Sequence, residues 1–374
     1  MWDEKRRKII ELHLKKELQS KEMYNGSFHD VWKRLGTIGI FRLLTLKKYG
    51  GVAETYGDIL WLSRLLGFLI PDSGLVFAIN NNMIVTSGII CRWAKEDIKN
   101  QYFEGLLDGN LIASFAITES DTGSDAFNIK STFHEEKDKI RVNGNKMYIS
   151  NGTEADIFIV IVKEKSTIGD NNEMAAVLLE KKDEGLVSSK LIEKMGLENC
   201  PMAELQMRNI LIPTMRMIGK KGMGQLICDI AFDWERCISF ASHLGKMQWI
   251  MEECVKYVNK RIQFNKTIGS NQLVAEKIVQ MKVSIDLGDL LLEKIANMKD
   301  YGKNTFLQSM IFKYFIGEKY TQCTLDSMQI FGAYGYCKES GIEQEVRNAL
   351  AAKIYSGTSE IMINNIASFL GILL

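Results

Sequence analysis

Residues 115–125 read FAITESDTGSD, and this stretch indicates a strand that leads into an exposed polar loop. A short apolar run comes first, and hydroxyl side chains, acids and Gly123 follow it. Hydroxyls and backbone N–H groups in such a loop can bind a phosphate or the polar edge of a ring. Taken alone, the stretch fits an ordinary polar turn equally well.

The sequence around this loop has the pattern of a small β-domain. Residues 157–162 form a β-branched run and residues 175–179 a second apolar run, with a turn predicted between them at 169–172. Residues 143–152 read NGNKMYISNG, and the Asn-Gly pair at each end predicts turns around a short strand. Several short strands at this spacing favour a small barrel or sandwich.

Helical patterns lie on both sides of this β-domain. Apolar side chains recur at helical spacing in residues 30–36, 59–66, 240–258, 273–298 and 305–331. The last three segments are long enough to form a bundle of packed helices. The expected fold is therefore mainly α with a central β-domain. Its three parts are an N-terminal helical domain at 1–110, a middle β-domain at 111–218 and a helical bundle at 219–374.

The composition is that of an ordinary globular protein. The chain has 374 residues, of which 46% are apolar and 25% charged. It carries 47 basic and 46 acidic side chains, so its formal net charge is +1. A nucleic-acid-binding protein usually shows a strong basic excess, so we do not expect a nucleic-acid partner. No apolar run reaches the ~18 residues of a transmembrane helix, and no membrane partner is expected.

The cysteines and the N-terminus bear on location and metal binding. The seven cysteines are scattered without a Cys-x-x-Cys pair, and the chain has only four histidines, so we expect no zinc site. The basic residues 5–8 are not followed by an apolar segment, so no signal peptide is expected. Scattered cysteines indicate reduced thiols and a cytoplasmic location.

Three further motifs occur later in the chain: RIQFNK at 261–266, QIFGAYGY at 329–336 and IYSGTSE at 354–360. Arg261 could bind a phosphate through two parallel hydrogen bonds, although a solvated basic face explains the local sequence as well. The glycines of the second motif allow close approach of a ligand, and they also fit a helix-ending turn. In their order and spacing, these motifs and residues 115–152 resemble the acyl-CoA dehydrogenase family across essentially the whole chain.

The resemblance implies a C-terminal four-helix bundle and an FAD bound between that bundle and the β-domain. It also implies a homodimer or homotetramer, in which Arg261 reaches the FAD pyrophosphate of a partner subunit. The residues that the resemblance places at the FAD are Phe115, Ile117, Thr118, Ser124, Tyr148, Ser150, Arg261, Phe264, Gln329, Gly332, Thr358 and Glu360.

Some positions depart from the family pattern. Tyr148 and Ser150 fall where the family usually has tryptophan and threonine. Ser120 replaces a common proline, and Asn265 and Ala333 replace common glycines. These replacements are small or polar, so FAD binding is still expected.

The most consequential departure is Ser356, which stands where most of the family carries its catalytic glutamate. A serine cannot remove an unactivated proton from carbon at neutral pH. In a minority of the family the glutamate lies on the first long bundle helix just before an arginine, and Glu235-Arg236 matches that position. The helical neighbours of Glu235 include Phe232, Ala231, Ile238 and Ser239. Because apolar neighbours desolvate a carboxylate, we expect the pKa of Glu235 to be raised.

Two alternatives to this assignment remain at this point. Glu235 could be an exposed glutamate that pairs with a basic side chain, and Asp233 is a competing acid, although it projects from a different face of the helix. With Glu235 as the base, Ser356 leaves room for the carboxylate, and its backbone N–H is expected to donate to the thioester carbonyl.

The reaction implied is FAD-dependent α,β-dehydrogenation of an acyl thioester. Glu235 would remove the Cα proton, and flavin N5 would accept the Cβ hydride. The acyl group could be carried by coenzyme A, as in short- or branched-chain catabolism, or by a carrier protein of natural-product biosynthesis, which is the preferred interpretation. An electron-transfer flavoprotein or dioxygen would be the acceptor. The alternatives from other classes are a flavin monooxygenase and a non-catalytic thioester-binding protein on the same fold.

Overall fold

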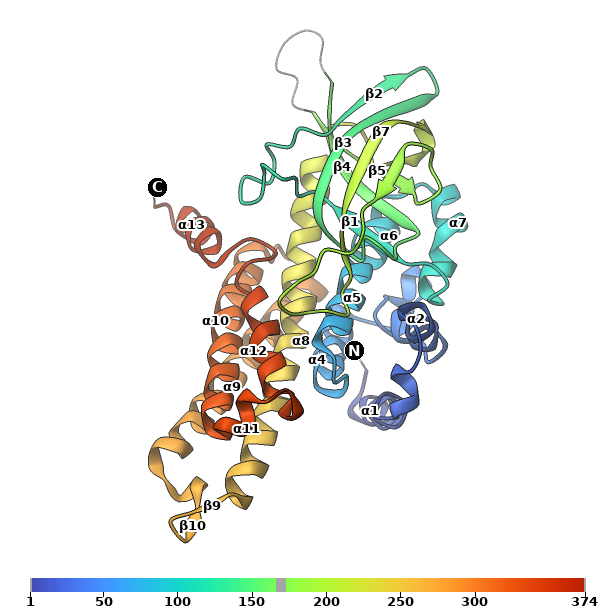
Figure 1. The fold of residues 1–374 in the computed structure, drawn as a ribbon. Helices are drawn as coiled ribbons and strands as arrows, with labels where there is room; N and C mark the ends of the chain where they lie inside the picture. The colour runs from blue at the N-terminus through green and yellow to red at the C-terminus, as the bar shows by residue number, and fades with distance from the viewer. Residues whose placement is uncertain (1, 166–172, 373–374) are drawn as a thin grey trace.

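The computed structural model describes residues 2–165 and 173–372, and the turn predicted at 169–172 lies outside them. It confirms a mainly α fold with a central β-domain (Figure 1). Helices occupy the N-terminal part, a sheet follows in the middle, and long helices form the C-terminal part. The N-terminal helices are α1 (Glu4–Leu18), α2 (Phe28–Thr37), α3 (Ile40–Leu43), α4 (Tyr56–Leu69), α5 (Ser73–Met83), the π-helical η3 (Ile84–Ile90), α6 (Cys91–Trp93) and α7 (Glu96–Leu107).

Helix α5 continues through η3 into α6 as one apolar rod. By length and composition Ser73–Trp93 could cross a membrane, which corrects the expectation that no such segment exists. The whole apolar window is buried inside the protein, where α5 and η3 pack against the long helix α8 (Gly224–Lys260). The segment is therefore accounted for as a core helix.

The middle part is one hydrogen-bonded sheet in the order β6-β7-β3-β2-β4-β5-β8, and β1 pairs in parallel with β4. Alternate residues of β4 face two different cores, which explains its continuous apolar run. The strands are β1 (Ala113–Ala116), β2 (Thr132–Glu136), β3 (Lys139–Ser150), β4 (Ile157–Glu164), β5 (Met174–Glu180), β6 (Leu186–Ser188), β7 (Met202–Pro213) and β8 (Met217–Ile218).

The first Asn-Gly pair of NGNKMYISNG is not a turn, and that prediction was wrong. Strand β3 runs through Asn143-Gly144 and is bulged there against β7. A side chain at Gly144 would lie 2.3 Å from Ser131 Oγ, and its φ is 139°, so only glycine fits this bulge. The second pair, Asn151-Gly152, does form a turn, with Asn151 in a left-handed conformation.

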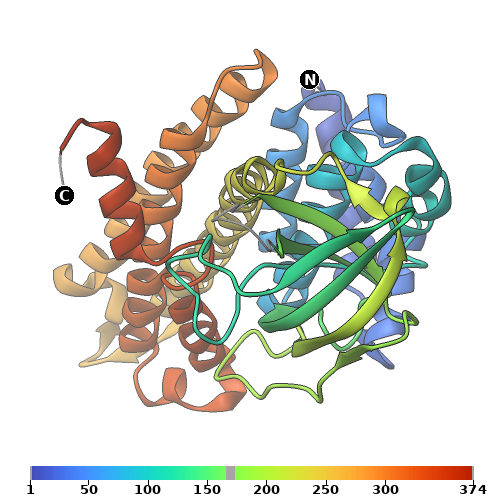
Figure 2. The ribbon, with the colours of Figure 1, turned by 90° about the horizontal axis from the view of Figure 1, so that it is seen from above.

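The C-terminal part is a helical bundle built around α8. Its other helices are α9 (Gln272–Asp300), α10 (Phe306–Phe331), α11 (Ala333–Tyr336), α12 (Ile342–Ala351) and α13 (Ser359–Phe369). A small hairpin, β9 (Ile262–Gln263) with β10 (Lys266–Thr267), follows the end of α8 and lies at the tip of the bundle (Figure 1). Seen from above, α8 stands between the sheet and the remaining bundle helices (Figure 2).

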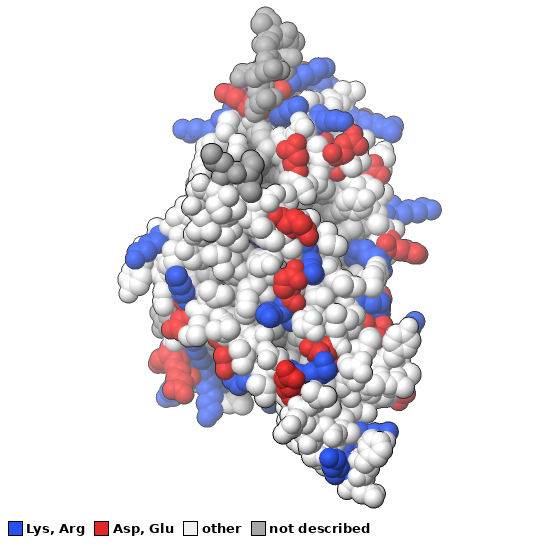
Figure 3. Space-filling model, turned by 90° about the vertical axis from the view of Figure 1, so that its left-hand side faces the viewer, with Lys and Arg blue, Asp and Glu red and all other residues white. Residues whose placement is uncertain are grey.

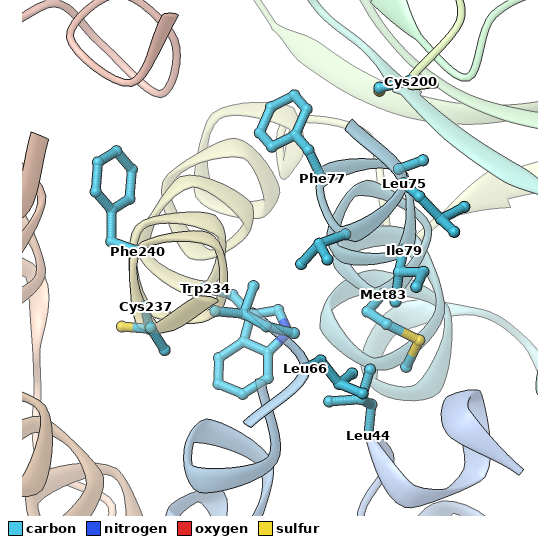
Figure 4. Close-up of a cluster of buried hydrophobic side chains, with 14 of the residues drawn as sticks. Leu44, Leu66, Leu75, Phe77, Ile79, Met83, Cys200, Trp234, Cys237 and Phe240 are labelled. Atoms are coloured by element: carbon cyan, nitrogen blue, oxygen red, sulfur yellow. The ribbon is translucent and has the colours of Figure 1, made fainter. Parts of the chain in front are cut away.

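Helix α8 is fixed by very close packing against α4. A Cβ atom at Gly67 would lie 1.9 Å from the carbonyl oxygen of Ser242, and one at Gly245 would lie 1.8 Å from that of Arg64. Trp234, Cys237 and Phe240 of α8 then enter the same apolar core as Phe77 and its neighbours on α5 (Figure 4). This contact determines where the residues between 231 and 242 are presented.

Candidate active site

Glu235 lies in the first third of α8, and only 8% of its surface is exposed. Its neighbours on the helix, Ala231, Ile238 and Ser239, are completely buried. Burial raises the pKa of the Glu235 carboxyl, and the nearby Ser356 hydroxyl and the charges of Arg236 and Lys313 oppose that rise. The sequence-based prediction of a desolvated carboxylate with a raised pKa is therefore confirmed.

The turn that carries Ser356 lies against Glu235, although the two residues are 121 positions apart (356 minus 235). Ser356 is in a left-handed conformation, with φ 57°, and its carbonyl oxygen accepts a hydrogen bond of 3.1 Å from Arg236 Nε. Its hydroxyl is buried and lies close enough to the Glu235 carboxyl to lower the pKa of that group. Arg236 therefore holds the Ser356 turn against α8, at the residue next to Glu235 in the sequence.

An aromatic cluster fills the space behind this turn. The ring of Tyr355 lies 4.4 Å from that of Phe77 and 5.7 Å from that of Phe240, measured between centroids. The Tyr355 hydroxyl is hydrogen-bonded to Nε2 of His243. Burial lowers the pKa of His243 to about 3, so its imidazole is neutral at neutral pH. His243 therefore adds no charge beside Glu235 and orients Tyr355.

Asp233, the competing acid, is turned away from this site. Its carboxylate forms an ion pair with Lys299 and accepts hydrogen bonds from the Thr305 hydroxyl at 2.9 and 3.1 Å. The expectation that Asp233 projects from another face of α8 is confirmed, because Lys299 and Thr305 belong to the α9 side of the bundle.

Among the predicted residues of the β-domain, Phe115 contacts α8 directly. Phe115 of β1 makes an edge-to-face contact with Phe232 of α8, with centroids 6.4 Å apart. Tyr148 is 56% exposed and has a φ of 59°, at an irregularity of β3 that turns its side chain outward. Thr118 and Ser150 are half-buried at the ends of neighbouring strands, and Ile117 is buried behind them.

A buried ion pair holds the loop that follows β1. Lys146 of β3 donates to the carbonyl of Ile117 at 2.9 Å and to Glu119 at 2.7 Å, while Glu119 also accepts the backbone N–H groups of Lys130 and Ser131. Within this loop Ser124 is exposed, and the buried Thr122 hydroxyl lacks a partner among the described residues. The loop extends from the sheet toward the bundle (Figure 2).

The other predicted residues form two further groups. Thr358 caps α13 by accepting the Ile361 N–H at 3.3 Å, and Glu360 lies exposed in the first turn of that helix, directly after the Ser356 turn. Arg261, Phe264, Gln329 and Gly332 lie at the opposite end of the bundle, where Tyr257 of α8 stacks on Phe331 of α10 at 4.3 Å.

The far group cannot serve the same site as Glu235 within one chain. Arg261 follows Glu235 by 26 residues on α8 (261 minus 235), which corresponds to about 39 Å of helix. Arg261 is exposed and Phe264 is 93% exposed at the hairpin tip. These side chains therefore face away from their own chain's carboxylate and are available to a second copy.

The near group has the chemistry that an FAD requires. Aromatic and apolar side chains at the sheet edge, Phe115 and Tyr148 among them, can cover a planar ring. The half-buried hydroxyls of Thr118 and Ser150 and the unpartnered Thr122 hydroxyl can hydrogen-bond its polar edge and phosphates. The residues present thus fit the flavin implied by the sequence.

Comparison with known proteins identifies the class. Models of the acyl-CoA dehydrogenase N-terminal, middle and C-terminal domains match residues 1–110, 114–210 and 222–371. An L-prolyl-[peptidyl-carrier protein] dehydrogenase from Serratia sp. is 30% identical over 92% of this chain and 89% of its own. The prolyl acyl carrier protein oxidase AnaB is similar at a TM-score of 0.93 with 31% identity, covering both chains completely. The FAD complex of PigA reaches 0.91 with 28% identity, over 100% of this chain and 99% of that one.

The chain therefore belongs to the acyl-CoA dehydrogenase family. Its members are FAD-dependent oxidoreductases that act on acyl thioesters, and this protein is an enzyme of that class.

Three side chains near the site were not identified from the sequence as part of it: Lys146, Lys313 and His243. Each is a buried polar side chain. Lys313 could have been singled out from the sequence Ile311-Phe312-Lys313-Tyr314-Phe315. A lysine within such an apolar helical stretch is expected to be buried, and lysines are almost never fully buried unless they are paired.

Proposed function

We propose that Glu235 is the catalytic base that removes the Cα proton of the acyl thioester. The observation that carries this proposal is a buried carboxylate, with a raised pKa, placed beside the Ser356 turn by the Arg236 hydrogen bond. A carboxylate whose pKa lies nearer the working pH is the stronger base for carbon acids. Ser356 supports this role because its small side chain leaves the position beside Glu235 open.

The residues around Glu235 have separate roles in this reaction. FAD supplies the acceptor for the Cβ hydride. Glu235 takes the Cα proton on its carboxylate, and the exclusion of water by the Tyr355–Phe77–Phe240 cluster keeps that carboxylate weakly solvated. The backbone N–H of Ser356 would donate to the thioester carbonyl, where negative charge grows as the proton leaves. Phe115 and Tyr148 would cover the flavin.

The preferred substrate is an acyl or aminoacyl group on a carrier protein. The support comes from the relatives, whose names specify prolyl-carrier proteins. The pair Lys220-Lys221 adds nothing to this choice, because Lys221 is already paired with Glu164. The same reactive end is presented by coenzyme A, so the two carriers differ only far from Glu235.

Anaerobic mixing of the FAD-loaded enzyme with prolyl-carrier protein and with short acyl-CoA thioesters tests both points. We expect flavin bleaching and loss of two hydrogens from the carrier-bound substrate by mass spectrometry, and neither in Glu235→Gln, although FAD stays bound. Glu252→Gln, which alters a carboxylate on the same helix away from the site, should behave as wild type.

Normal bleaching in Glu235→Gln would disprove the assignment of the base. Faster turnover of acyl-CoA than of the same acyl group on the carrier protein would reverse the substrate preference. The anaerobic half-reaction does not depend on whether dioxygen or an electron-transfer flavoprotein is the natural acceptor.

A further inference from the structure

Lys313 of α10 is a completely buried lysine. Its ammonium makes one hydrogen bond, of 3.4 Å, to the carbonyl oxygen of Lys353, and it lies 5.7 Å from the centroid of the Phe240 ring. None of the described carboxylates forms an ion pair with it. Burying a cation with so few partners costs free energy of folding. This cost indicates that Lys313 has a role other than stabilising the fold.

The surroundings of Lys313 are those of the catalytic base. Lys353 begins the turn that carries Ser356, so the bond to its carbonyl ties this turn to α10, as Arg236 ties it to α8. Glu318, the nearest acid along α10, is already paired with Lys353 at 2.8 Å and accepts a hydrogen bond from Ser359. Three described carboxylates, those of Glu318, Glu235 and Glu360, act on the charge of Lys313, and of these three only Glu235 is buried.

We propose that Lys313 is a positioning residue for the base: it holds the Ser356 turn against the bundle, and its charge keeps the Glu235 carboxylate ionised. Burial lowers the pKa of Lys313 to about 8, so the ammonium is still protonated at neutral pH and supplies that charge. A positive charge near a buried carboxylate stabilises the ionised form and opposes the effect of desolvation. This inference rests on the proposed role of Glu235.

Other titratable groups lie around Glu235 and Lys313, and the direction of their effect on the ionisation of these two residues follows from their charge. Arg236 also favours the ionised carboxylate, Tyr355 is neutral because burial and the Glu235 charge raise its pKa well above the usual value, and α5 contributes no titratable side chain. The charges of Arg236 on α8, Glu318 on α10 and Glu360 on α13 act on Lys313, and those of Arg236 and Lys313 act on Glu235. The charge of Lys313 also acts on His243, and that of Glu235 acts on Tyr355.

The test is an infrared pH titration of the FAD-loaded protein without substrate. The C=O band of the protonated carboxyl that disappears in Glu235→Gln reports the ionisation of Glu235. We expect this band to persist to higher pH in the neutral variants Lys313→Met and Lys313→Gln, and to titrate as in wild type in Lys313→Arg. Substrate-driven flavin reduction should fall about tenfold on the acid side in the neutral variants and recover at high pH.

Lys246→Met is the matched control, because Lys246 is also buried but donates to the carbonyls of Ile70 and Pro71 and does not act on Glu235. Lys313→Gln retains a hydrogen-bond donor and serves if the methionine variant does not fold. An unchanged titration of the Glu235 band in a folded neutral variant would overturn the inference. Because the band is read without substrate, this outcome is distinct from a failure of the proposed dehydrogenation.

Discussion

At the scale of single residues, Glu235 combines reactivity with a cost in stability. Its pKa is higher in the folded protein than in the unfolded chain, because burial disfavours the ionised form. The folded state therefore binds this proton more tightly, and the stability contributed by the group falls as pH rises from the unfolded value toward the folded one. Above both values the full cost of the buried charge is present.

It follows that Glu235→Gln should stabilise the protein at pH 8. The gain in free energy of unfolding should be about 1.4 kcal/mol for each unit by which the fold raises the pKa, and it should shrink as pH is lowered. Denaturant unfolding of both proteins at pH 8 and at pH 5 measures the difference. A variant less stable than wild type at pH 8 would contradict the desolvation of Glu235.

The sequence was informative about this residue and its helical neighbours, because side chains three and four positions apart share a helix face in any context. It did not reveal that the charge of Lys313 acts on Glu235. Lys313 lies 78 positions away (313 minus 235) on another helix, and no local pattern specifies which faces of two helices meet.

At the scale of elements, the placement of the base depends on the contact between α4 and α8. The backbones meet at Gly67 and Gly245, where no side chain can be accommodated without displacing a carbonyl group. A shift of α8 there would move Glu235 relative to the Ser356 turn. The sequence does not indicate this role for either glycine, because an isolated glycine in a helix shows only that there is some local reason for its presence.

Gly67→Ala should therefore destabilise the protein by about 1–3 kcal/mol, as expected for overpacking of a close helix contact. Gly123→Ala is the control for stability, because nothing lies within 4 Å of the added carbon. Denaturant unfolding compares the two variants. Equal stability of Gly67→Ala and Gly123→Ala would show that α4 and α8 can separate freely, contrary to the packing.

In strand β3, strand pairing prevented a turn that the local sequence predicts. Asn-Gly favours a two-residue hairpin turn when the chain can reverse there. Here the pairing of β3 with β7 continues across Asn143-Gly144, while the pairing with β2 ends at Asn143, so the Asn-Gly pair forms a bulge within the strand. The Asn-Gly pair correctly indicated a glycine with an unusual backbone conformation. The pairing of the sheet determined that this glycine forms a bulge and not a turn.

At the scale of the whole molecule, the predicted FAD residues separate into a near group around Glu235 and a far group at the hairpin tip. The resemblance predicts that the far group meets the near group of another copy. Exposed apolar side chains on α9, such as Leu273 and Leu290, and the broad uncharged areas on the face in Figure 3 are suited to burial between copies.

We therefore expect complementation between subunits. Glu235→Gln and Arg261→Ala should each lose most activity alone, because each lacks one half of every site. Mixed oligomers obtained by co-expression contain sites in which both residues are intact, so activity should return to about a quarter to a half of wild type if adjacent copies pair at random. Flavin reduction by the purified mixed oligomer, against the two single variants, measures this. Mixed oligomers no more active than the single variants would place Arg261 outside the site.

The sequence by itself determined the three-part organisation, because helical periodicity and β-branched runs express local preferences that survive in the fold. It also determined the chemistry of the candidate base, through the motif that places Glu235 before Arg236 and a serine at 356. The tertiary structure decided which groups surround that base. The Ser356 turn, Lys313 and the Tyr355–His243 pair come together only because α4, α8 and α10 pack at fixed contacts, and the desolvation that makes Glu235 reactive is a property of that packing.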